Sequence, residues 1–123
     1  MERDTREIRK GDIFYIQKAA HVGSEMISDG RPAIIVSNDD CNQHSEVVEA
    51  VFLTTRAKHK MPTHVFIASA PRPSTALCEQ ITSVSKQRIT EFAGRITKEE
   101  MMRMERAMMI SLDVQYGIKE QRK

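Results

Sequence analysis

The sequence has little cysteine and lacks the spacings that bind metals or form disulfide frameworks. Cys41 and Cys78 are its two cysteines, with no CxxC pair and no Cys/His cluster. This argues against a disulfide scaffold and a structural zinc site, and predicts two free, largely buried thiols. HExxH, Walker A, the Rossmann glycine fingerprint and GxSxG are also missing. We therefore expect no metal, no cofactor and no nucleotide or acyl-transfer chemistry.

Long hydrophobic runs are absent as well. The longest, such as Ala33–Val36 and Ala50–Leu53, fall far short of the roughly 18 residues that a membrane helix needs. The N-terminal MERDTREIRKGD is charged and lacks the apolar region of a secretory signal. The sequence thus predicts a cytoplasmic protein that does not bind membranes.

Neither sign of charge is in large excess. Lys and Arg number 19 against 17 Asp and Glu, a net charge of +2. No overall field draws the molecule to nucleic acid, so any such contact must come from local patches. The 123 residues, 40% apolar and 29% charged, are typical of one soluble domain. We expect a flexible arm over residues 1–9, a single domain over 10–117 and a solvated tail over 118–123.

The chain contains five segments with β character, separated by short turn-rich connections. They are Gly11–Ile16, Arg31–Asn38, Glu46–Thr55, His64–Ser69 and Ala76–Val84. Residues 38–42 form a turn cluster. The segment 19–30 is long for a connection in a compact domain, which makes it a candidate lid or binding loop.

One convincing helix follows the strands. Thr97 and Glu100 form a capping box, and Lys98–Tyr116 then runs without Gly or Pro until Gly117. Its apolar face is unusually wide, which favours a subunit interface over plain core. The interface residues that we expect are Met104, Met108 and Met109. Short strands followed by a helix predict the α+β class, with a small SH3-like antiparallel β-barrel.

Several polar residues lie where strands meet loops, and each has two readings. Arg31 presents donors suited to a phosphate, or anchors a loop. Thr54 and Thr55 end a strand and face opposite sides. His64 and Glu79 are acid/base candidates or structural residues. A basic loop contacts an RNA backbone or is simply solvated; its residues are Arg56, Lys58, His59 and Lys60.

The order of these motifs along the chain resembles the MazF/PemK family of toxin endoribonucleases, and most of all its MazF branch of Gram-positive bacteria. The resemblance covers most of residues 10–116. The motifs that carry it are GDIFYI, VGSE, RPAIIVSND, FLTT, MPTHV, CEQI, SKQRI and MISL.

The resemblance implies a homodimer of SH3-like barrels that cleaves single-stranded mRNA at short sequences without ribosomes, metal or cofactor. It also implies a cognate antitoxin that blocks the RNA groove, with operator DNA bound only through that antitoxin. Arg31 and Thr54 are the implied catalytic pair, with adjacent Thr55 as the alternative to Thr54. The implied RNA-binding residues are Ser24, Glu25, Asn38, Thr55, His64, Glu79 and Gln80.

The chemistry implied is attack of the RNA 2′-OH on the neighbouring phosphate, which leaves a 2′,3′-cyclic phosphate and a 5′-OH. Arg31 then stabilises charge on the phosphate oxygens, and Glu25, His64 and Glu79 are equal candidates for the base. Leu77 stands where relatives of the Kid/PemK branch have an arginine, so a mechanism built on that arginine does not transfer. The competing functions are a CcdB-like gyrase poison and a catalytically silent co-repressor of the same fold.

Overall fold

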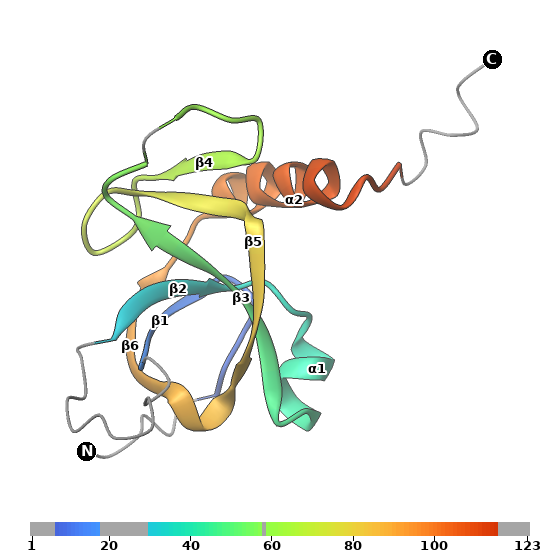
Figure 1. Cartoon of the computed structure of the whole chain (residues 1–123). Helices are drawn as coiled ribbons and strands as arrows, with labels where there is room; N and C mark the ends of the chain where they lie inside the picture. The colour runs from blue at the N-terminus through green and yellow to red at the C-terminus, as the bar shows by residue number, and fades with distance from the viewer. Residues whose placement is uncertain (1–6, 18–29, 58, 116–123) are drawn as a thin grey trace, which may run out of the picture.

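The computed structural model describes residues 7–17, 30–57 and 59–115. Figure 1 shows one curved sheet with a long helix packed at one end and a short helix at the other. The strands are β1 (Asp12–Ile16), β2 (Arg31–Ile35), β3 (Val47–Thr54), β4 (His64–Ile67), β5 (Ser74–Ser85) and β6 (Ile89–Arg95). The helices are α1 (Asp39–His44) and α2 (Lys98–Leu112), and a 3-10 turn, η1 (Lys86–Arg88), precedes β6.

All strand pairs are antiparallel, in the order β4-β5-β3-β2-β1-β6. The five predicted strands are confirmed and a sixth, β6, is added. Within the described residues β4 and β6 are both edge strands, so the predicted barrel is an open, curled sheet. The α+β class stands.

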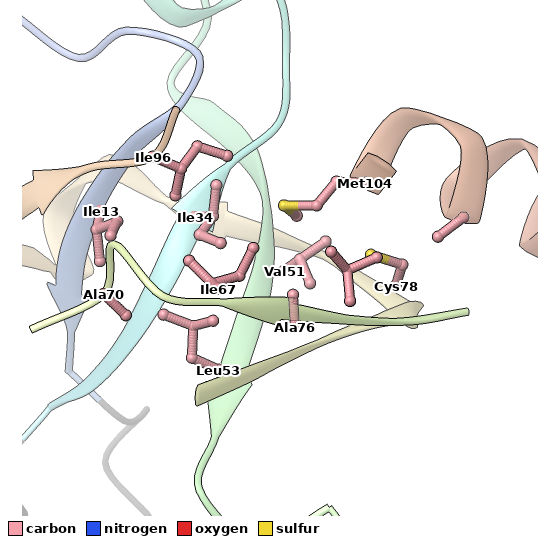
Figure 2. Close-up of a cluster of buried hydrophobic side chains, with 12 residues drawn as sticks. Ile13, Ile34, Val51, Leu53, Ile67, Ala70, Ala76, Cys78, Ile96 and Met104 are labelled. Atoms are coloured by element: carbon pink, nitrogen blue, oxygen red, sulfur yellow. The ribbon is translucent and has the colours of Figure 1, made fainter. Parts of the chain in front are cut away.

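The sheet is buried on both faces, which explains the continuous apolar runs of β2 and β3. One core cluster packs between the sheet and α2 and includes Ile34, Val51 and Met104; Figure 2 shows the Met104 side chain reaching toward Val51 and Cys78. The second cluster fills the inside of the curl and includes Phe14 and Ile35. Successive residues of a strand point to opposite faces, so each strand contributes to both cores.

Helix α2 begins with the predicted capping box. The Glu100 backbone N–H donates to Thr97 Oγ1 at 3.1 Å, and the Thr97 N–H donates to Glu100 Oε1 at 2.8 Å. The helix ends at Leu112, where Asp113 adopts a left-handed conformation with φ 56°. The prediction that it continues to Tyr116 is therefore wrong. A left-handed residue stops the helical hydrogen-bond pattern before the glycine is reached.

The predicted turn at residues 38–42 is in fact the start of α1. The Asn38 side chain caps this helix by accepting from the Cys41 N–H at 2.8 Å, and Asp39 and Asp40 lie in its first turn. Cys41 is exposed on the helix and Cys78 is buried, and both are free. The prediction of buried thiols thus holds for Cys78 alone. None of the described helices is long and apolar enough to cross a membrane.

Candidate active site

Arg31 is the first residue of β2, and its side chain is held by the neighbouring strand β3. Its Nη2 donates to the Leu53 carbonyl at 3.3 Å, and its guanidinium carbon lies 4.9 Å from the centre of the Phe52 ring. A cation over an aromatic face contributes about 0.5–1 kcal/mol at an exposed site. Because only one of its donors binds a residue that the structure describes, the planar fork of Arg31 has further N–H groups to offer an anion.

Gly30 fixes the backbone at the start of this strand. A Cβ added to Gly30 would lie 2.9 Å from the Ile16 carbonyl oxygen of β1. Real Cβ atoms do not approach backbone so closely, so any side chain here would force β1 and β2 apart. Ile16 and Arg31 are themselves register partners. The close packing at Gly30 therefore fixes the backbone position of Arg31 relative to β1.

Thr54 ends β3 on the strand next to Arg31. The β2–β3 register pairs Ala33 with Phe52; continued by two residues, it sets Arg31 opposite Thr54. Thr54 Oγ1 accepts from the Arg56 N–H at 3.1 Å, which leaves its hydroxyl proton available for another acceptor. Thr55 follows the strand and is exposed.

Arg31, Thr54 and Thr55 line one cleft of about 370 Å³. Its described lining contains a second guanidinium, that of Arg72, and neither a carboxylate nor an imidazole. The full lining is Tyr15, Arg31, Pro32, Leu53, Thr54, Thr55, Ala70, Pro71, Arg72 and Ser74. Two guanidiniums with hydroxyl groups, and without acidic groups, suit an anion such as a phosphate.

Arg72 and Ser74 were not among the predicted site residues; Arg72 lies in the β4–β5 connection and Ser74 begins β5. Ser74 Oγ donates to the Arg72 carbonyl at 2.6 Å, and Ser74 is buried. This bond holds the loop that carries Arg72 against the cleft. An arginine between two prolines, where the backbone is stiff, is the sequence signal that points to Arg72.

A second cleft, of about 740 Å³, adjoins the first along the sheet. It is formed by the β3–β4 connection together with β4 and Thr75 of β5. Its lining is Ala57, His59, Lys60, Met61, Pro62, His64, Phe66 and Thr75. The exposed aromatic ring and the basic groups give this cleft a chemical character different from that of the first.

His64 and Glu79 meet at the edge of the second cleft. Glu79 Oε2 lies 3.2 Å from His64 Nε2, and Glu79 Oε1 accepts from Thr63 Oγ1 at 2.9 Å. Burial alone would raise the pKa of Glu79, but hydrogen bonds from its own backbone N–H, from Thr63 and from His64 outweigh it and lower the pKa. His64 Nδ1 is buried without a hydrogen-bond partner in the described structure. This pair is therefore built as a structural link between β4 and β5.

Alternation along β5 explains this orientation of Glu79, which lies on the same face as Leu77, the register partner of His64. The pairing of β5 with β3 is irregular here: between the pairs Val51–Ile81 and Leu53–Ala76, β3 advances by two residues and β5 by five, which forms a bulge. Gln80, in the same bulge, is exposed on β5.

Residues 9–112 match the family model described as PemK-like, MazF-like toxin of type II toxin-antitoxin system. The chain belongs to this toxin family. Endoribonuclease EndoA of Bacillus subtilis (strain 168) is 33% identical over 110 residues, which cover 85% of this chain and 94% of the relative.

Solved structures of similar proteins agree with the assignment. An endoribonuclease in complex with its cognate antitoxin, from a mycobacterial species, superposes with a TM-score of 0.72 at 25% identity over 87% of this chain and 96% of the other. The MazE–MazF structure from Deinococcus radiodurans gives 0.76 at 19% identity over 89% and 98%. At 19% identity, the similarity to the Deinococcus structure shows a shared fold.

The predicted site residues of this toxin do not all gather at one place. Arg31, Thr54 and Thr55 share the first cleft, whereas His64 lines the second. Asn38 was expected to bind RNA, but it lies beyond the far end of β2 from Arg31, where its side-chain oxygen caps α1. Ser24 and Glu25 lie outside the described residues, as does most of the 19–30 loop.

Helix α2 of the toxin presents an apolar surface, and one of the three methionines predicted at a subunit interface does not contribute to it. Met104, predicted at a subunit interface, is 0% exposed and belongs to the core beneath the sheet. Met108 is half-buried and packs against the same core, and Met109 is half-buried as well. The exposed apolar side chains of α2 are Met102, Ile110 and Leu112.

Proposed function

We propose that this toxin is a sequence-specific endoribonuclease that cleaves single-stranded mRNA without ribosomes, with Arg31 and Thr54 as its catalytic pair. One observation carries the proposal: the two residues come from adjacent strands to one cleft that holds two guanidiniums and, among its described residues, no acidic group. The name of the Bacillus relative, an endoribonuclease, supports it.

The reaction uses a nucleophile that the RNA itself supplies. The 2′-oxygen attacks the adjacent phosphorus and the P–O5′ bond breaks. The leaving 5′-oxygen takes a proton from water, so that the products are a 2′,3′-cyclic phosphate and a 5′-OH. The free N–H groups of Arg31 stabilise the charge that builds on the non-bridging oxygens. The Thr54 hydroxyl, which accepts from Arg56 N–H, directs its proton to one of those oxygens. No step of this scheme calls for a metal ion.

A base must take the proton from the 2′-OH, and we propose Glu25. Of the three candidates, His64 lines the second cleft and Glu79 is bound to His64 and Thr63. Glu25 belongs to the segment that joins β1 to β2, and Arg31 begins β2 beside the first cleft. Elimination of the other two supports Glu25.

The partners that we propose follow the family. The chain forms a homodimer through the exposed apolar side of α2, a cognate antitoxin binds and inhibits it, and operator DNA is reached only through that antitoxin. An antitoxin-bound mycobacterial structure supports the second of these. Because its substrate is mRNA, the toxin acts in the cytoplasm. Ile110→Glu tests the dimer: it should halve the sedimentation mass at low micromolar concentration, and an unchanged mass would contradict the interface.

The experiment that tests the function maps cuts in a long RNA kept unfolded by an RNA chaperone, in excess EDTA. The wild type should give discrete cuts with 5′-OH ends, and Arg31→Ala should lose about 10²–10³ in kcat or more. Arg9→Ala, which removes an exposed guanidinium that pairs with Glu7 before β1, is the matched control and should cut normally. Intact RNA with folded wild-type dimer would favour a gyrase poison or a silent co-repressor instead.

A further inference from the structure

One row of side chains crosses the sheet from the first cleft to the second. Thr54 of β3 pairs with Thr75 of β5, and Thr75 pairs in turn with Phe66 of β4. Arg31 stands at the other end of the row, opposite Thr54. Paired residues on neighbouring strands point to the same face of a sheet. The catalytic pair and Phe66 therefore share one surface.

Phe66 is an unusual residue on this surface. It is 59% exposed, although its neighbours Val65 and Ile67 are buried in the core that packs against α2. Alternation along β4 turns the Phe66 ring away from that core. Its position on an edge strand gives no packing reason for an aromatic ring here, and a charged residue would protect such an edge better.

Basic groups surround this ring. His59 and Lys60 line the same cleft, and neither has an ion-pair partner among the residues that the structure describes. The described lining of this cleft contains no carboxylate, and Glu79 beside it is engaged by Thr63 and His64. Proteins hold single-stranded nucleic acid with exposed aromatic rings beside basic side chains, with bases stacked on the rings and phosphates along the basic groove.

We propose that Phe66 stacks against a base that flanks the cleaved bond, while Lys60 contacts the RNA backbone, so that the second cleft continues the RNA path of the first. The proposal rests on the proposed function. Two strand spacings separate the backbones at Thr54 and Phe66, about 10 Å. This distance places the ring beside a nucleotide near the scissile phosphate rather than at the phosphate itself.

The same observations argue against a second copy of this chain as the occupant of the cleft. A two-fold contact brings identical patches together, so the unpaired basic groups beside Phe66 would meet their own copies. Interface cores are also depleted of charge. Ile110 of α2 lines a further cleft together with Phe66, but Arg103 and Arg106 line that cleft too, so this side of the ring is also basic.

Binding measurements test this with a short RNA that carries one mapped cut site and a 2′-deoxy nucleotide at that site, which blocks cleavage. Phe66→Leu, which keeps an apolar side chain, should weaken binding at least about 5-fold, and Phe66→Trp should preserve it. Val47→Ala, at the far end of β3 and also exposed, is the control. A plot of the logarithm of the binding constant against the logarithm of the salt concentration gives the salt dependence of binding. Lys60→Gln should reduce the slope of this plot by about one, and Phe66→Leu should leave the slope unchanged.

A series of RNAs, each abasic at one position, identifies the stacked base. At that position the wild type should lose as much affinity as Phe66→Leu does, and the variant should lose nothing further. Normal binding by Phe66→Leu, or additive losses at every position, would overturn the proposal. So would a fall in sedimentation mass, which would assign Phe66 to a protein contact. If the wild type cuts no RNA in the mapping experiment, the proposed function is refuted, and the binding tests are then made with a single-stranded RNA of random sequence. Failure of the wild type to bind either RNA refutes the stacking.

Discussion

Replacing Met104 by alanine tests whether this methionine belongs to the core rather than to a subunit interface. The side chain is fully buried in the cluster between α2 and the sheet, alongside Val51, Cys78 and Ala107. Truncation removes three heavy atoms from a position enclosed by both layers. The surrounding strands are paired on both sides and cannot close the space, so a cavity remains.

The expected loss follows from burial. Met-to-Ala changes in cores destabilise by about 2–5 kcal/mol. At about 2.1 cal/mol/K of unfolding entropy per residue, a chain of this length changes its Tm by about 4 °C per kcal/mol. The variant should therefore melt about 8–20 °C below the wild type.

Urea and thermal unfolding at two protein concentrations, tenfold apart, measure the effect. The matched control is Met61→Ala in the β3–β4 connection, where the side chain is 43% exposed; it should change stability by less than about 0.5 kcal/mol. If Met104 lay in a subunit interface, the loss of stability in Met104→Ala would depend on the protein concentration, and the sedimentation mass would fall. A loss below about 1 kcal/mol would refute the core assignment.

Three further changes probe the site. Arg31→Lys keeps the charge but loses the planar fork, and should lower kcat about 10²–10³-fold; near-normal cleavage of mapped RNA would contradict the electrostatic role. Asn38→Ala should cost about 1 kcal/mol in urea unfolding by uncapping α1, with cleavage unchanged; a specific cleavage defect would restore its predicted RNA contact. Glu79→Gln should destabilise by about 1–3 kcal/mol at pH 7. The folded-state pKa of Glu79 is lowered, so the stability difference between wild type and variant is present above the ordinary pKa of 4.5 and should vanish as the pH falls through the folded-state pKa. A stability difference that stays constant from pH 7 to pH 3 would exclude the ionised carboxylate as its source.

Local signals in the sequence predicted most of the elements. The capping box located the start of α2, and the apolar runs of β2 and β3 were strong because both faces of these strands are buried. β6 escaped notice because it is mostly half-exposed and contains Gly94 at φ 142°. α1 was mistaken for a turn, although Asn38 with acidic residues directly after it is a typical helix start.

The site was predictable only as far as neighbouring strands define it. Arg31 and Thr54 each end a strand next to a loop, which a single sequence can reveal. Arg72 and Phe66 join them through the β4–β5 and β3–β5 pairings, and no local pattern specifies such long-range registers. The methionine stripe misled for a related reason: helical spacing does not tell which side of α2 meets the sheet.

The tight contact at Gly30 separates the position of the catalytic arginine from the choice of target sequence, two properties that an enzyme must usually adjust together. Since the Gly30 backbone packs directly on Ile16, the position of Arg31 is set by strand pairing and is insulated from the composition of the preceding segment. Insertions and substitutions before residue 30 can thus accumulate without displacing the guanidinium. As long as Glu25 is kept, such a toxin can acquire a new target sequence in evolution while its cleavage chemistry stays intact.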